Sequence, residues 1–96
     1  GESGPLAVRI GGVRPNPGRG ALHWDFDLPS STTAWIEVFD AAGRCLYAER
    51  IEHRAVSGGW SWSGRRLDGG PAPAGTYFLK MRIGDRTAVR AATLLR

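Results

Sequence analysis

Few side chains in this sequence of 96 residues have the types and spacing that enzyme active sites use. The two histidines are His23 and His53, and no serine lies in a nucleophile-elbow sequence. The single cysteine, Cys45, cannot form an internal disulfide or a cysteine-based zinc site. We therefore expect no catalytic residues and no cofactor. We expect Cys45 to be a small apolar side chain buried on a strand.

Carboxylates are the remaining candidates for metal ligands. Asp25 and Asp27 alternate with apolar residues and would project from one strand face about 7 Å apart. His23 shares that parity, which is typical of a solvated strand face. No calcium-loop spacing is present, so we expect no metal, and a structural or adventitious calcium ion is the alternative.

The four tryptophans suggest a core and one candidate contact. Trp24, Trp60 and Trp62 have inward parity in alternating segments, which favours core packing. Trp35 has the opposite parity and is predicted to be exposed. An exposed indole can stack on a sugar ring, so Trp35 is a candidate ligand contact of a carbohydrate-binding module.

The formal net charge is +4, and arginine carries nearly all of the positive charge. A basic balance can indicate nucleic acid or an acidic surface as the partner. Here the arginines are scattered along the sequence, without a block of five or six like charges. We expect them on solvated strand faces and turns, and we expect no nucleic-acid partner.

The elements that must position these residues are predicted to be strands. The chain contains 14 glycines and 6 prolines, and turn signals divide it into short alternating segments. No apolar run is long enough to span a membrane. Seven strands are expected, at residues 6–10, 22–28, 34–39, 45–51, 60–62, 76–83 and 87–95.

Seven alternating strands can each bury an apolar face if two antiparallel sheets pack face to face in an all-β sandwich. A chain of this length forms one domain. We expect residues 6–96 to form the module and residues 1–5 to be a linker or an expression remnant. The predicted core consists of Trp24, Phe26, Ile36, Val38, Trp62, Tyr77 and Leu79.

Two turn motifs have clear structural roles. In Val38–Arg44, the Asp40 carboxylate can accept hydrogen bonds from backbone donors of a hairpin turn, while Gly43 adopts positive φ. In the second motif, Gly64 lets the chain turn sharply just after Trp62 enters the core.

Two further motifs flank the remaining strands. In Ala74–Tyr77, we expect Gly75 to permit close backbone approach before Tyr77 enters the core, with the tyrosine hydroxyl bonded back to a loop as in tyrosine corners. Near the start of the chain, Asn16 lies between two prolines in a strong strand breaker.

These motifs, in this order, resemble the immunoglobulin-like domain of the flagellar hook-capping protein. They resemble still more closely the related C-terminal modules of secreted bacterial proteins, including type IX secretion sorting domains. The resemblance covers residues 6–96 and implies an immunoglobulin-like or fibronectin-III-like sandwich. Two positions depart from the pattern: Ser63 replaces a frequent acidic residue, and Gly18 replaces a frequent aromatic one.

For the sorting domains, the resemblance implies recognition by an outer-membrane secretion machine and an extracellular or cell-surface location after periplasmic transit. For the hook-capping domains, it implies protein–protein assembly. We therefore expect a non-catalytic, monomeric module that acts in sorting, surface anchoring or docking on a neighbouring domain. The alternatives are a carbohydrate-binding module and a purely structural spacer.

Overall fold

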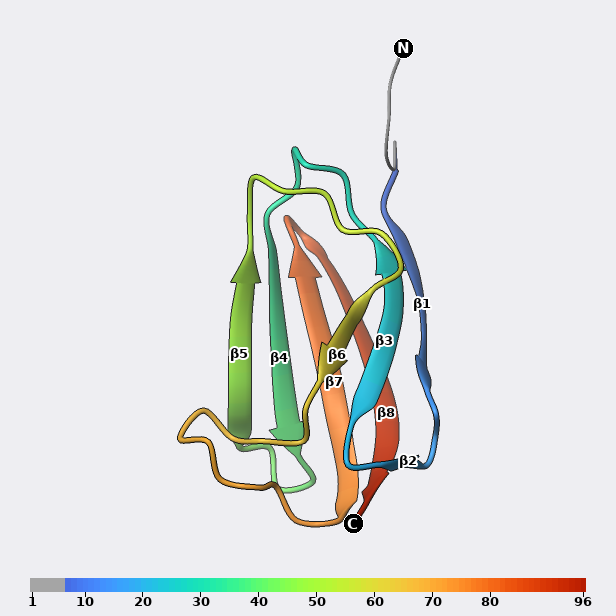
Figure 1. Ribbon diagram of the computed structural model, residues 1–96. Helices are drawn as coiled ribbons and strands as arrows, with labels where there is room; N and C mark the ends of the chain where they lie inside the picture. The colour runs from blue at the N-terminus through green and yellow to red at the C-terminus, as the bar shows by residue number, and fades with distance from the viewer. Residues whose placement is uncertain (1–6) are drawn as a thin grey trace.

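The computed structural model describes residues 7–96, and all of its regular elements are strands. They are β1 (Arg9–Arg14), β2 (Gly18–Arg19), β3 (Leu22–Asp27), β4 (Ala34–Asp40), β5 (Cys45–Ile51), β6 (Trp60–Trp62), β7 (Gly75–Ile83) and β8 (Arg86–Leu95). Figure 1 shows them as two layers whose strands run roughly along the long axis of the molecule. Within this part of the chain there is no helix that could cross a membrane.

The strands form a three-stranded sheet in the order β1-β3-β6 and a five-stranded sheet in the order β2-β8-β7-β4-β5. All neighbouring strands are antiparallel except β2 and β8, which pair in parallel through Gly18 and Leu94. The prediction of an all-β fold in two sheets is confirmed. The predicted count of seven strands, all antiparallel, is wrong: there are eight strands, and one pairing is parallel.

The N-terminal strand is shifted from its predicted position. Residues 6–10 were expected, but β1 spans Arg9–Arg14, and its register with β3 shifts between Ile10 and Val13. The intervening Gly11–Gly12 pair allows this irregularity, because glycine suits a bulge. Residue 6 and the linker expected at residues 1–5 lie outside the described residues.

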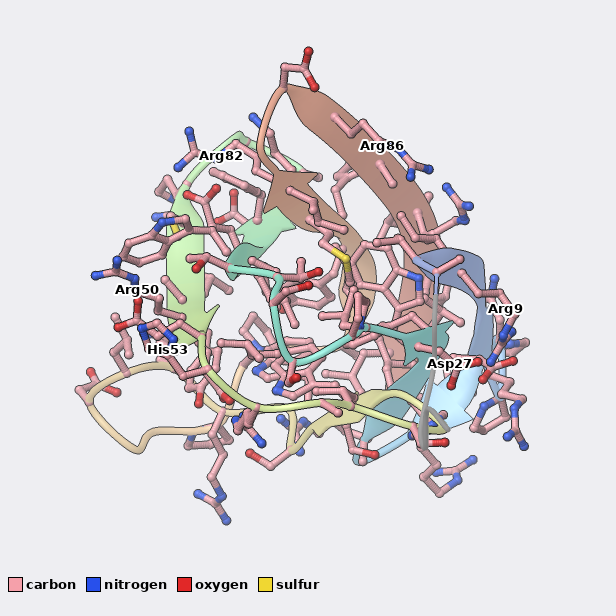
Figure 2. All side chains as sticks on the ribbon, turned by 90° about the horizontal axis from the view of Figure 1, so that it is seen from above. Arg9, Asp27, Arg50, His53, Arg82 and Arg86 are labelled. Atoms are coloured by element: carbon pink, nitrogen blue, oxygen red, sulfur yellow. The ribbon has the colours of Figure 1, made fainter. Side chains whose placement is uncertain are left out.

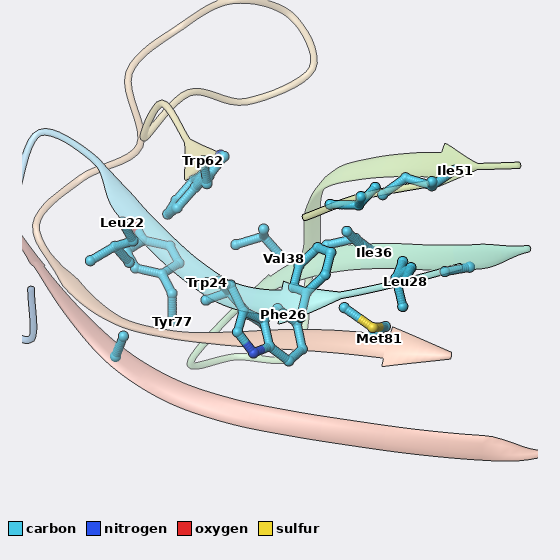
Figure 3. Close-up of a cluster of buried hydrophobic side chains, with 14 of the residues drawn as sticks. Leu22, Trp24, Phe26, Leu28, Ile36, Val38, Ile51, Trp62, Tyr77 and Met81 are labelled. Atoms are coloured by element: carbon cyan, nitrogen blue, oxygen red, sulfur yellow. The ribbon is translucent and has the colours of Figure 1, made fainter. Parts of the chain in front are cut away.

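A single core fills the space between the two sheets, and Figure 3 shows many of its side chains. Each of the seven core residues predicted from the alternation is at most 2% exposed, so this prediction is confirmed. Trp24 and Phe26 pack edge to face with ring centroids 5.8 Å apart, a favoured aromatic geometry. Trp60 lies at the margin of the core and is only partly buried.

Cys45 is exposed, so the expectation of a buried cysteine is wrong. The cause is a register shift between β4 and β5. Val38 pairs with Tyr47, but the next residue, Phe39, pairs with Cys45 and not with Leu46. The extra residue places Cys45 opposite an outward-facing position of β4.

Different turns and connections lie at the two ends of the molecule. Residues 14–20, 40–46, 62–77 and 93–96 gather at the lower end in Figure 1, and we call this region the motif end. The connections at residues 28–33, 52–59 and 84–85 lie at the opposite end. The motif end therefore collects most of the punctuating residues that the sequence singles out.

Candidate functional site

At the motif end, Asp40 organises the turn between β4 and β5. Its Oδ1 accepts hydrogen bonds from the backbone N–H groups of Ala42 (3.0 Å) and Arg44 (2.9 Å), and its Oδ2 accepts one from Arg44 Nε (2.7 Å). Gly43 completes the turn with a φ of 86°. The backbone N–H of Arg44, with help from its guanidinium, holds the pKa of the Asp40 carboxyl below its ordinary value.

The turn after β6 depends on Gly64. Its φ is 75°, and an added Cβ would lie 2.6 Å from the carbonyl oxygen of Gly20. The preceding Trp62 is 1% exposed, and its indole N–H donates to the carbonyl of Arg65 at 2.8 Å. This buried donor is satisfied by the loop itself, so Trp62 joins the core to the loop.

Tyr77 packs against the same indole. Its ring centroid lies 5.1 Å from that of Trp62, and its hydroxyl donates to the Pro73 carbonyl. Burial raises the pKa of the Tyr77 hydroxyl above its ordinary value. Gly75, in contrast, has open space where a Cβ would lie, so the predicted close backbone approach there is wrong.

Two further contacts secure the motif end. The side-chain oxygen of Asn16 accepts a hydrogen bond from the backbone N–H of Thr93 at 3.0 Å. The guanidinium of Arg96 donates to the carbonyls of Ala72 (2.8 Å) and Gly64. Segments far apart in the sequence are therefore held together here.

A pocket of about 290 Å³ opens between the β4–β5 turn and the start of β7. Its wall combines one carboxylate, one guanidinium and several apolar side chains. The lining residues are Asp40, Ala41, Ala42, Arg44, Leu46, Pro73, Ala74, Gly75, Thr76 and Tyr77. The Asp40 carboxylate in this wall is already engaged by turn donors and Arg44.

One arginine, Arg44, lines this pocket, and further arginines occur in the other segments of the same end although they are dispersed in the sequence. The segments of the motif end contain Arg14, Arg19, Arg44, Arg65, Arg66 and Arg96, against Asp40 and Asp68. Sequence reasoning treated these arginines as scattered and missed their convergence. A signal was present: both turn glycines, Gly43 and Gly64, are followed directly by arginine.

Trp35 lies away from this site, on the outer face of the five-stranded sheet. Its side chain is 40% exposed, and the Arg50 guanidinium lies 5.5 Å from the ring centroid. One face of the indole is therefore covered by a cation. The candidate sugar contact and the motif residues do not form one site.

His23, Asp25 and Asp27 lie on the outer face of the other sheet, and an arginine holds both carboxylates. Arg9 binds Asp27 at 2.6 Å and Asp25 at 2.8 Å, and Figure 2 shows Arg9 and Asp27 side by side. These bonds lower the pKa of both aspartates. Among residues 7–96, no group of three His, Cys, Asp or Glu side chains is placed to hold a metal ion.

The other contacts on that face are also structural. The two ring nitrogens of His23 lie 2.8 Å from Ser61 Oγ and 2.6 Å from the Gly58 carbonyl. Asp27 accepts a hydrogen bond from the Gly58 N–H at 2.9 Å. Together these bonds hold the 52–59 connection against β3.

No protein-family model and no curated protein sequence matches this chain. Two solved structures from Porphyromonas gingivalis share its fold. PorZ, an essential bacterial surface component of the type IX secretion system, matches with a TM-score of 0.65 and 20% identity over 91% of this chain and 11% of PorZ. Dimeric latent PorU matches with a TM-score of 0.64 and 15% identity over 91% of this chain and 9% of PorU. The chain thus corresponds to about a tenth of each of these proteins.

Proposed function

We propose that this chain is a non-catalytic, immunoglobulin-like docking module of a secreted bacterial protein, recognised by a type IX secretion system at the cell surface. The module would sort or anchor its parent protein through protein–protein contact. The proposal concerns residues 6–96 as one unit and assigns no reaction to them.

The observation that carries this proposal is the fold match to PorZ, which extends over 91% of the chain. The match spans a single small part of PorZ, as expected of a module appended to larger proteins. The ordered sequence motifs give independent support, because they resemble sorting modules of the same secretion system.

The chemistry of the motif end agrees with a binding role. Its best-placed polar side chains are already engaged in structural bonds: Asp40 with its turn, Asn16 with Thr93, and the Tyr77 hydroxyl with Pro73. Such groups shape a surface, whereas a catalytic acid or base must be free to give a proton to the substrate or to take one from it. We do not propose carbohydrate binding, because the Arg50 guanidinium lies over the ring of Trp35 on which a sugar would stack.

Deletion from the parent protein tests the proposal. Cells that produce the parent without residues 6–96 should retain it in the periplasm, while the intact parent reaches the surface or the medium. Surface exposure is measured by protease accessibility of intact cells. A parent carrying Trp35→Ala serves as control and should be exported normally. Normal export of the deleted form would contradict the proposal.

A further inference from the structure

We infer that the motif end is a docking surface for an acidic protein segment, whose carboxylates bind the exposed arginines and whose single aliphatic side chain enters the pocket beside Arg44. This inference rests on the proposed function and names the surface and the chemistry of the partner. It draws on the distribution of charge, the type of cation and the size of the pocket.

The positive charge of the molecule is concentrated at the motif end. The four chain segments that make up the motif end contain six arginines and two aspartates, an excess of four positive side-chain charges. Over the rest of the described residues, cations and anions almost balance. The cations are Arg9, Arg50, Arg54, Lys80, Arg82, Arg86 and Arg90, and the anions are Asp25, Asp27, Glu37, Glu49, Glu52 and Asp85. A field concentrated at one end steers a partner of opposite charge to that end.

Five of the six guanidiniums of the motif end form no ion pair with an acidic side chain of the described residues. Arg44 is the one member that forms an ion pair with a described carboxylate, and its side chain is 78% exposed. Arg65 and Arg96 donate to backbone carbonyls, which orients their guanidiniums without neutralising them, and Arg19 donates to the main-chain oxygen of Arg96, the last residue of the chain. Arginine presents a planar fork that matches a carboxylate in two bonds, so this surface suits glutamate and aspartate side chains.

The arginines and the pocket belong to the same surface. Arg44 lines the pocket, and the Arg96 guanidinium donates to the carbonyl of Ala72, the residue next to the lining residue Pro73. The backbone N–H of Leu67 donates to the Leu46 carbonyl at 3.0 Å, which places the arginine-bearing loop beside the lining strand.

The pocket favours a protein segment over a lipid surface. Its volume of about 290 Å³ is at the small end of ligand pockets (roughly 300–1,000 Å³), and its apolar lining includes Leu46, Pro73 and Ala74. A pocket of this kind accepts one aliphatic side chain from a bound chain. A surface that inserts into lipid needs a broad apolar face, whereas the segments of the motif end expose two large apolar side chains, Leu67 (68% exposed) and Leu95 (36% exposed).

Paired arginine variants of the whole chain test the inference. The probe is a fluorescein-labelled peptide of glutamates around a single leucine, titrated at low salt and followed by fluorescence anisotropy. Arg44→Gln with Arg66→Gln should weaken binding by about tenfold, since each exposed charge pair contributes somewhat under 1 kcal/mol. Arg82→Gln with Arg86→Gln removes the same charge at the opposite end and should change binding by less than about twofold. Arg66→Gln alone is a second variant, because its side chain makes no hydrogen bond with the described residues.

Several results would overturn the inference. These are no binding of the peptide by the unmodified chain, equal loss in the two double variants, and tighter binding to phosphatidylglycerol vesicles than to the peptide. Export of the parent protein separates this inference from the proposed function. If deleting residues 6–96 blocks export but Arg44→Gln with Arg66→Gln does not, the secretion role stands and the docking surface is wrong. If deletion leaves export normal, the secretion role fails whatever the peptide binds.

Discussion

Two glycines at the motif end show how single residues set the backbone on which the site is built. Gly43 and Gly64 both have positive φ, a region that other residues occupy at a cost of about 1–2 kcal/mol. They differ in their surroundings. Nothing lies within 4 Å of a Cβ added at Gly43, but the Gly20 carbonyl oxygen lies 2.6 Å from one added at Gly64. Both turns were predictable from sequence, whereas this contact joins residues from different loops and was not.

The two glycines therefore make a matched pair of variants. Gly43→Ala should destabilise the protein by about 1 kcal/mol through backbone strain alone. Gly64→Ala should cost about 2–4 kcal/mol, because the loop or the Gly20 segment must also move. Urea unfolding followed by tryptophan fluorescence gives both values. Equal effects would show that the close approach to Gly20 does not matter.

Asp40 gives a prediction of pH dependence. Its folded-state pKa lies below the ordinary aspartate value of about 3.9, so the carboxylate stabilises the fold above that value. This contribution is lost as the pH falls through the lower folded-state pKa. Asp40→Asn should therefore be less stable near neutral pH and should lose less stability than the unmodified chain between about pH 5 and pH 2. Urea midpoints measured across this range give the comparison, and parallel curves would contradict it.

At the scale of elements, alternation predicted the strands with long apolar faces and failed where a strand has none. β4 and β7 alternate over seven and nine residues, so their positions and buried faces were evident. β2 is only two residues long and has no period to detect. Its pairing with β8 joins segments that are far apart in the sequence. The register shift that exposes Cys45 lies within the β4–β5 hairpin and leaves the alternation of each strand unchanged, so the pattern did not reveal it.

Asn16 lies just before β2, so substituting it measures how much the hydrogen bond from this segment to β8 contributes to stability. Asn16→Ala removes the acceptor for the Thr93 N–H and should destabilise the protein by about 0.5–1.5 kcal/mol. Asn16→Asp keeps an acceptor oxygen at the same place and should retain most of the stability. Hydrogen exchange of the Thr93 amide should accelerate in the alanine variant only. Unchanged exchange would mean that this hydrogen bond does not hold the segment to β8.

At the scale of the whole molecule, charge and architecture give the chain two unlike ends. Figure 2 looks onto the end where Arg9 is paired with Asp27, and Arg50 and Arg82 also have acidic partners, Glu52 and Glu37. At the motif end only Arg44 has one among the described residues. Composition predicted the net charge, but its location follows from topology, which brings four separate chain segments to one end. The all-β class and the core were therefore predictable, and the basic surface was not.

The most direct test of the account is whether this chain suffices to deliver a reporter protein. A fluorescent reporter directed to the periplasm is fused to residues 1–96 in bacteria that have a type IX secretion system, and its exposure on intact cells is measured by protease accessibility. We predict that the fused reporter becomes surface-exposed, whereas a fusion carrying Trp62→Ala, which removes a fully buried indole, does not. A reporter that stays in the periplasm with the unmodified chain would contradict the account.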